Sequence, residues 1–172
     1  AGFDAKGKAV TLLGSGGAAR AVALALIDAG AAVIYVVARQ PRKIEKLVLD
    51  LKPLTPAGTT ITWAYWGDGS FLRSLETADL LVNCTPAGTA GSATAGQTVI
   101  DASLIQPHTL VFDLVYNPAE TPLVAAAKSR GAKAHSGLGM LVYQAAESFR
   151  LWTGTDADVR AMRDAGRKAL GQ

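Results

Sequence analysis

The sequence predicts a doubly wound α/β fold, in which a parallel sheet of six strands carries helices on both faces as in a Rossmann-like domain. Two observations predict it. Short apolar runs alternate with helical segments along the chain, and a glycine-rich turn follows the first of these runs. No internal repeat or linker divides the sequence, so residues 1–172 are expected to form one domain.

The first half of the chain supplies four of the expected strands. Val33–Val37 is a run rich in β-branched residues, which is typical of a parallel strand buried on both faces. A proline at the first position favours a helix over residues 41–51. The other elements expected here are strands over 9–13, 60–64 and 79–83, a helix over 17–28, and at most a short helix over 71–75.

The second half predicts two further strands and ends in helices. The strands cover residues 109–113 and 133–135, and the helices cover 122–129, 140–152 and 156–170. Small polar residues over 91–96 indicate a mobile loop. An apolar stripe at helical spacing is expected to lie in the core. It consists of Leu141, Ala145, Phe149 and Trp152.

Composition narrows the class of protein. Hydrophobic residues make up 49% of the chain and charged residues 18%, as in a globular protein. The net charge of +3 is too small and scattered to indicate nucleic-acid binding. The only cysteine, Cys84, cannot form an internal disulfide and is expected to be inert. Neither a membrane span nor a signal peptide is recognised, so a cytoplasmic location is expected.

The turn after the first strand has the spacing of a dinucleotide-binding fingerprint. Gly14, Gly16 and Ala19 match G-x-G-x-x-G/A. Gly14 permits the tight turn, and the absence of a Cβ at Gly16 lets backbone N–H groups approach a pyrophosphate. These groups lie at the positive end of the following helix. The alternative is a simple small-residue turn, but the flanking strand and helix favour nucleotide binding.

The end of the second strand indicates which dinucleotide is bound. NAD enzymes usually carry an acid there for the ribose hydroxyls, whereas this chain has Arg39, Arg42 and Lys43 and no acid. A guanidinium binds a 2′-phosphate well, so the sequence favours NADP over NAD. The alternative is a solvated charged face, which accounts for Arg42 better than for Arg39.

Two later stretches are more specific than the glycine turn. They are the runs Val115–Leu123 (Val-Tyr-Asn-Pro-Ala-Glu-Thr-Pro-Leu) and Gly137–Gln144 (Gly-Leu-Gly-Met-Leu-Val-Tyr-Gln). Together with Lys8–Ala21 and Leu151–Gly154, they make the chain closely resemble shikimate dehydrogenase. The resemblance covers only the C-terminal cofactor domain of that family. The N-terminal domain, which binds most of the substrate and carries the catalytic Lys and Asp, has no counterpart here, so no catalytic residue is expected in this chain.

The resemblance implies roles for particular residues. The pyrophosphate loop is expected at Gly14, Ser15, Gly16, Gly17 and Ala18. The clamp on the 2′-phosphate is expected at Ala38, Arg39, Gln40 and Lys43, where Ala38 and Gln40 replace the family's Asn and Thr. Further cofactor contacts are expected at Thr85, Leu114, Gly137 and Met140. Substrate contacts are expected at Tyr116 and Gln144. No metal ligand is expected.

The implied parent activity is the reversible, NADPH-dependent reduction of 3-dehydroshikimate to shikimate, a step of aromatic amino acid biosynthesis. The chain alone is expected to bind the cofactor and to be inactive. One alternative is a quinate/shikimate dehydrogenase with broader cofactor use, because the clamp is altered. Others are a stand-alone NADPH-binding module and a methyltransferase that uses S-adenosylmethionine, although the latter leaves Arg39 and Lys43 unexplained. On spacing alone, Gln144 reads as a solvated polar residue and Tyr116 as a half-buried aromatic.

Overall fold

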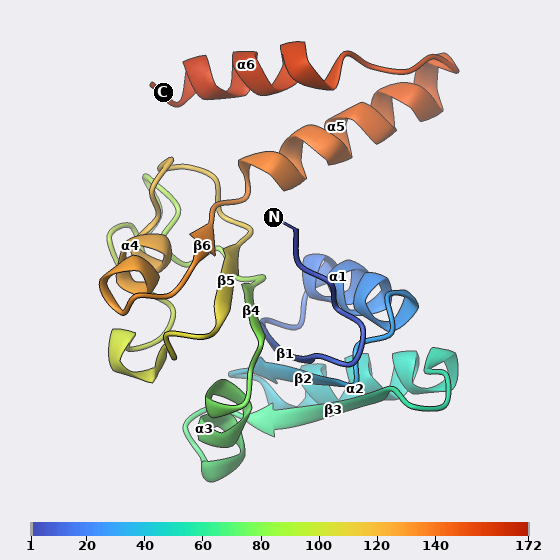
Figure 1. Cartoon of the computed structure of the whole chain (residues 1–172), viewed down its shortest axis with the longest axis vertical. Coiled ribbons are helices and arrows are strands. Elements are labelled where there is room, and N and C mark those ends of the chain that lie inside the picture. The colour runs from blue at the N-terminus through green and yellow to red at the C-terminus, as the bar shows by residue number, and fades with distance from the viewer. Residues whose placement is uncertain (1, 172) are drawn as a thin grey trace.

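A six-stranded parallel sheet forms the centre of the computed structural model, which describes residues 2–171 (Figure 1). The strands are β1 (Ala9–Leu13), β2 (Val33–Ala38), β3 (Thr60–Tyr65), β4 (Leu80–Asn83), β5 (Leu110–Asp113) and β6 (Ala134–His135). Their order across the sheet is β3-β2-β1-β4-β5-β6, and every pair is parallel. The predicted doubly wound fold is confirmed, and the strand order reverses between β1 and β4.

Helices follow most of the strands and cover both faces of the sheet. The helices are α1 (Gly17–Asp28), α2 (Pro41–Leu51), α3 (Gly69–Glu76), α4 (Pro122–Ser129), α5 (Leu138–Thr153) and α6 (Val159–Ala169), with short 3-10 turns η1 (Lys52–Leu54) and η2 (Ala102–Leu104). Strand and helix positions agree with the sequence prediction apart from shifts at the ends. The two 3-10 turns were not predicted.

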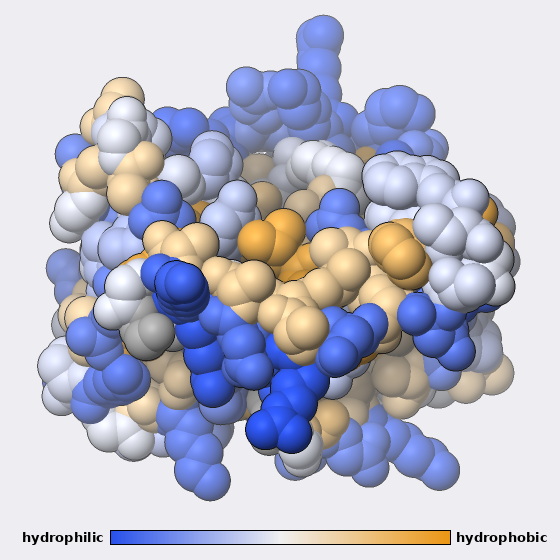
Figure 2. All heavy atoms as spheres, turned by 90° about the horizontal axis from the view of Figure 1, so that it is seen from above, coloured by the Kyte–Doolittle hydropathy of each residue, from blue (hydrophilic) through white to orange (hydrophobic). Residues whose placement is uncertain are grey.

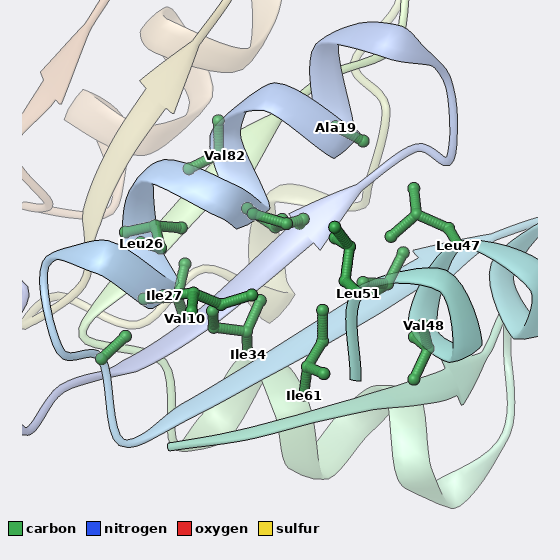
Figure 3. Close-up of a cluster of buried hydrophobic side chains, with 14 of the residues drawn as sticks. Val10, Ala19, Leu26, Ile27, Ile34, Leu47, Val48, Leu51, Ile61 and Val82 are labelled. Carbon is green, nitrogen blue, oxygen red and sulfur yellow. The ribbon is translucent and has the colours of Figure 1, made fainter. Parts of the chain in front are cut away.

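Alternate residues of each buried strand contribute to two different cores. Val10, Leu12 and Ile34 face α1 and α2 and pack with side chains such as Ile27 and Leu47 (Figure 3). On the other face, the cluster includes residues from β1 to β5, from α3 and α4 and from the connecting loops, among them Leu13, Val37, Leu81, Phe71 and Leu123. The sheet is therefore covered on both sides, as its apolar sequence requires.

Helix α3 is longer than the sequence suggested, and a carboxylate explains why. Asp68 is the N-cap residue, and its Oδ1 accepts hydrogen bonds from the N–H groups of Ser70 and Phe71 at 2.8 and 3.0 Å. These bonds satisfy donors that the first turn of a helix otherwise leaves unpaired. The helix consequently begins at Gly69, before the apolar residues from which it was predicted.

The last two helices form a hairpin that lies apart from the sheet (Figure 1). Helix α5 packs mainly against α6, where Arg163 lies over the ring of Tyr143 at 5.9 Å. Only Val142 of α5 is buried, and α6 has no buried residue. Trp152 is 83% exposed, Ala145 and Phe149 are exposed and Leu141 is half-buried. The prediction that this stripe lies in the core was wrong, because helical periodicity identifies an apolar face but not what covers it.

No helix within residues 2–171 combines the length and apolar character needed to cross a membrane.

Candidate functional site

A cavity of about 530 Å³ opens at the carboxyl ends of the strands, where the strand order reverses. The β1–α1 turn, the end of β2 and the segment after β4 all contribute to its walls. Eight of the residues predicted to bind a cofactor line it: Gly14, Ser15, Gly16, Ala38, Arg39, Gln40, Lys43 and Thr85. The topology thus brings together side chains from three separate turns in one cavity.

Gly14 makes the sharp turn at the end of β1. Its φ of +123° lies in a region that side chains rarely adopt, and a Cβ there would stand 3.1 Å from the backbone carbonyl of Cys84. Its N–H donates a 2.7 Å hydrogen bond to the carbonyl oxygen of Val37. The turn is therefore fixed between β2 and β4, and only glycine fits.

The first turn of α1 leaves its N–H groups accessible. Gly16 is the N-cap residue and provides no side-chain hydrogen bond, and no acidic residue occupies the first turn. A Cβ at Gly16 or Gly17 would meet no atom within 4 Å, so the space above these residues is open. A helix N-terminus with unpaired donors and open space beside it is suited to an anion such as a phosphate. Gly17 and Ala18, also predicted here, follow directly in the first turn of the helix.

The cationic side chains at the end of β2 lie on the same cavity. Arg39 and Lys43 line it together with Gln40, whereas Arg42 does not. Within residues 2–171, neither Arg39 nor Lys43 has a carboxylate within ion-pair distance. The same stretch of α2 begins at Pro41 without a side-chain cap. Two cations without an acidic partner thus lie at a helix N-terminus, where an anionic ligand would stabilise both.

A buried hydrogen-bond network positions the wall after β4. Asn83 Oδ1 accepts hydrogen bonds from the backbone N–H and the hydroxyl of Thr85 at 2.9 and 2.7 Å, and its Nδ2 donates to Asp113 Oδ1 at 2.9 Å. Asp113 also accepts from the N–H of Val115 and from the hydroxyl of Thr121, which caps α4. Burial raises the pKa of Asp113, while these hydrogen bonds act in the opposite direction. One carboxylate therefore joins the ends of β4 and β5 and the start of α4.

The residues predicted for the far end of the cofactor lie outside this cavity. Leu114 follows β5, and Gly137 is the N-cap residue of α5, with its N–H donating to the carbonyl oxygen of Val115 at 3.0 Å. A Cβ on Gly137 would collide with the Leu114 carbonyl, so these two segments are in close contact. Met140 is half-buried in the first turn of α5, whereas Tyr116 and Gln144 are exposed.

The cavity also contains residues that the sequence prediction did not assign to the site: Trp66, Cys84, Pro86, Ala87, Thr94, Gln97, Thr98 and Val99. Trp66 follows the carboxyl end of β3, a position from which it could have been found. Residues 94–99 could not have been found in this way. They do not follow a strand directly, and consecutive turns of the loop bring them to the cavity. The stretch 91–96 is joined by hydrogen bonds that include Ser92 and Thr94.

Cys84 lines the cavity in an environment that disfavours its thiolate form. Burial, followed by the charge of Asp113, raises its pKa from 9.0 to about 12. A thiol with this pKa is almost entirely protonated at neutral pH and is a poor nucleophile. Residues 2–171 contain no group of three or more His, Cys, Asp or Glu side chains that could hold a metal ion.

Comparison with known proteins extends these observations. The family model of the shikimate 5′-dehydrogenase C-terminal domain matches residues 137–165. The NADP(+)-dependent shikimate dehydrogenase of Moorella thermoacetica is 41% identical over 172 residues, which are 99% of this chain and 57% of that protein. The chain thus spans little more than half the length of this relative. The resemblance to shikimate dehydrogenases that the motifs indicated is confirmed.

Solved structures show the same similarity. The Thermus thermophilus shikimate 5-dehydrogenase, in complex with NADP(H) and shikimate, superposes with a TM-score of 0.79 at 34% identity and covers 98% of this chain and 57% of its own. The quinate dehydrogenase of Corynebacterium glutamicum, in complex with NAD, gives a TM-score of 0.79 at 30% identity over 97% of this chain and 57% of its own.

Proposed function

Since the chain is similar along almost its whole length to the C-terminal part of shikimate dehydrogenases, we propose that it is the NADP(H)-binding domain of such an enzyme. One observation carries this proposal. The open N-terminus of α1 and the two cations after β2, which have no ion-pair partner within residues 2–171, line a single cavity at the reversal of strand order. A dinucleotide with a third phosphate on its ribose matches that distribution of charge.

Each part of the cofactor has a proposed set of contacts. The pyrophosphate lies over the turn Gly14–Ala18, and the 2′-phosphate is bound by Arg39 and Lys43, with Ala38 and Gln40 beside it. Thr85 contacts the middle of the molecule. The nicotinamide extends toward Leu114, Gly137 and Met140, and the close contact between Leu114 and Gly137 holds these two segments together.

The parent reaction is the reversible reduction of 3-dehydroshikimate to shikimate. When bound, NADPH supplies the hydride, and this chain holds and orients it. Tyr116 and Gln144, both exposed near the N-terminal turn of α5, are proposed to contact the substrate. The resemblance assigns the acid/base groups to a part of the enzyme that this chain does not match, so the chain is proposed to bind NADPH without turning over shikimate.

The hairpin of α5 and α6 has a proposed role in domain association. Leu151 and Trp152 are among its most exposed apolar residues, and seen from above the molecule shows a band of hydrophobic side chains bordered by hydrophilic ones (Figure 2). Relatives such as the Moorella enzyme are nearly twice as long as the region matched here. We propose that the part of the enzyme that this chain does not match packs on the exposed face of the α5–α6 hairpin. This packing would cover the apolar side chains that nothing within residues 2–171 covers.

The test is a calorimetric titration of the chain with NADPH and with NADH. NADPH should bind more tightly, and Arg39→Ala should weaken NADPH binding about tenfold or more, because a charge-assisted hydrogen bond is lost, while changing NADH binding little. Arg42→Ala is the matched control, since Arg42 does not line the cavity. Equal loss in both variants, or no binding of NADPH to the unmodified chain, would contradict the proposal.

A second candidate is a dehydrogenase that accepts quinate and NAD as well. The observation in its favour is that Ala38 and Gln40 occupy positions of the clamp where hydrogen-bonding Asn and Thr are usual in the family. The similar quinate dehydrogenase of Corynebacterium glutamicum was solved with NAD. In the same titration, nearly equal affinities for NADH and NADPH would favour this candidate.

A further inference from the structure

Trp66 occupies an exposed position at the edge of the cleft. It follows β3, and its indole lines the cavity together with Arg39, Gln40 and Lys43. It also lines a neighbouring hollow of about 370 Å³ whose wall includes Phe71, Thr98 and Val99. The side chain remains 37% exposed, although a tryptophan at a strand end has apolar surface to bury.

The indole is held in a defined orientation. Its ring stacks on Phe71, with centroids 5.0 Å apart and planes inclined by 23°, and Phe71 is only 4% exposed. The N-cap bonds of Asp68 fix the backbone between the two rings. A ring that is already ordered loses little conformational freedom when a ligand binds, which favours its use as a binding surface.

The strand order determines which part of a nucleotide this ring can reach. The sheet runs β3-β2-β1-β4, so the end of β3 lies beyond the cations of β2 as seen from the turn after β1. A dinucleotide with its pyrophosphate at that turn and its phosphorylated ribose at Arg39 therefore directs the adjoining base toward Trp66. The other half of the molecule points the opposite way, toward β4 and β5.

We propose that Trp66 is the aromatic wall of the base subsite and stacks on the adenine of the bound nucleotide. This inference rests on the proposed NADP(H) binding and adds a positioning residue to it. Planar bases stack favourably on aromatic side chains, and a cation nearby on the same cavity wall strengthens a site for a phosphorylated nucleoside.

Two probes separate the base subsite from the rest of the cleft. NADPH occupies the whole site, whereas adenosine 2′,5′-bisphosphate carries the base and the phosphorylated ribose but no nicotinamide. Trp66→Ala should weaken both probes by a similar factor of about ten, the usual contribution of one stacked base. Trp66→Phe keeps a ring and should stay within about threefold of the unmodified chain.

Trp152→Ala is the matched control, because Trp152 is on the distant hairpin and is almost fully exposed. It should leave both affinities unchanged. Fluorescence gives a second readout that does not depend on the alanine variant folding. Trp66→Phe should remove the largest share of the quenching of tryptophan emission by NADPH, and Trp152→Phe should remove little of it.

The outcomes distinguish this inference from the proposed function. Normal NADPH binding to both Trp66 variants, with the quenching retained in Trp66→Phe, would overturn the role of Trp66 alone. A loss confined to NADPH, with the bisphosphate unaffected, would also overturn it, because the effect would then arise at the nicotinamide end. Failure of the unmodified chain to bind either probe would instead overturn NADP(H) binding, and the role of Trp66 with it.

Discussion

Gly137 lies against the carbonyl group of Leu114 so closely that no side chain fits between them. A Cβ at position 137 would overlap the Leu114 carbonyl oxygen and stand 3.0 Å from its Cα. The contact joins the end of β5 to the start of α5, the two segments that the proposed nicotinamide site requires. Gly137→Ala should therefore lower the free energy of unfolding by about 3 kcal/mol, because the backbones must separate.

Chemical denaturation measures this effect, and Gly139→Ala is the control. A Cβ at Gly139 meets no atom within 4 Å, and alanine is the better residue inside a helix. The control should be neutral or more stable by about 0.5–1 kcal/mol. Equal stability of the two variants would show that the close contact does not exist in solution.

Asp113→Asn should largely preserve the stability of the folded protein, whereas Asp113→Ala should not. Asp113→Ala leaves the amide of Asn83, the N–H of Val115 and the hydroxyl of Thr121 without a buried acceptor, which should cost about 3 kcal/mol or more. Asp113→Asn keeps the shape and removes a buried charge, so it should cost far less. Comparable losses in both variants, measured by urea denaturation, would argue against the network.

The difference in stability between the unmodified protein and Asp113→Asn should also change with pH in a defined direction. Burial raises the pKa of Asp113 in the folded state, so the folded protein binds this proton more tightly than the unfolded chain does. The stability of the unmodified protein relative to Asp113→Asn should therefore fall as the pH rises from the unfolded pKa of 3.8 through the folded pKa. A relative stability that rises over this interval would contradict the raised pKa.

Asp79 should show the opposite pH dependence. Its carboxylate accepts hydrogen bonds from the N–H of Ala9 at 2.9 Å and from Lys8 Nζ at 3.1 Å, which hold its pKa below 3.8. The stabilisation is present above the unfolded pKa and is lost as the pH falls through the folded pKa. Asp79→Asn should cost about 1 kcal/mol near neutral pH and nothing in strong acid. Denaturation curves of the unmodified protein and of Asp79→Asn, measured from neutral pH to strong acid, test this prediction. A difference in the free energy of unfolding that persists in strong acid would show that the Asp79 charge is not its cause.

Cys84 should resist alkylation in the folded protein. With a pKa of about 12, little thiolate is present at pH 8, and the residue is also half-buried. Iodoacetamide labelling followed by mass spectrometry should be far slower in the native protein than in urea. Native labelling as fast as that of the unfolded chain would mean that the cavity wall opens readily.

The exposed face of the hairpin should tolerate polar substitutions. Trp152→Ser and Leu151→Ser should change the free energy of unfolding by less than about 0.5 kcal/mol, because neither side chain is buried. Val142→Ser is the contrasting variant on the same helix and should cost about 2 kcal/mol, since Val142 is only 4% exposed. Losses at Trp152 as large as at Val142 would show that this chain itself covers the face in solution.

The sequence was sufficient to predict the sheet because buried parallel strands such as Val33–Ala38 are continuous apolar runs, and the glycines and prolines mark their ends. It was also sufficient to predict that Gly14 and Arg39 belong to one site, because the fold places both on one cavity. The environment of Trp152 could not be predicted in this way. An apolar helix face looks the same in a sequence whether the chain covers it or leaves it open.

The residues around Thr98 were missed for a related reason. Their contribution depends on where a loop crosses the cavity, and loop paths follow from long-range packing that no local pattern contains. Hydrogen-bond partners such as Asp113 and Asn83, which are 30 residues apart, are likewise visible only when adjacent strands are placed side by side. Trp66 was missed although its place directly after β3 put it at the edge of the sheet where ligands bind.

The carboxylate of Asp113 also restricts how the cleft can move. Because it is bonded to Asn83 at the end of β4 and to Val115 after β5, neither loop can shift without disturbing the other. The spacing between the segments that follow β4 and β5 is therefore set by the protein itself. If the proposed cofactor lies across both segments, this fixed spacing would select ligands by their length as well as by their charge.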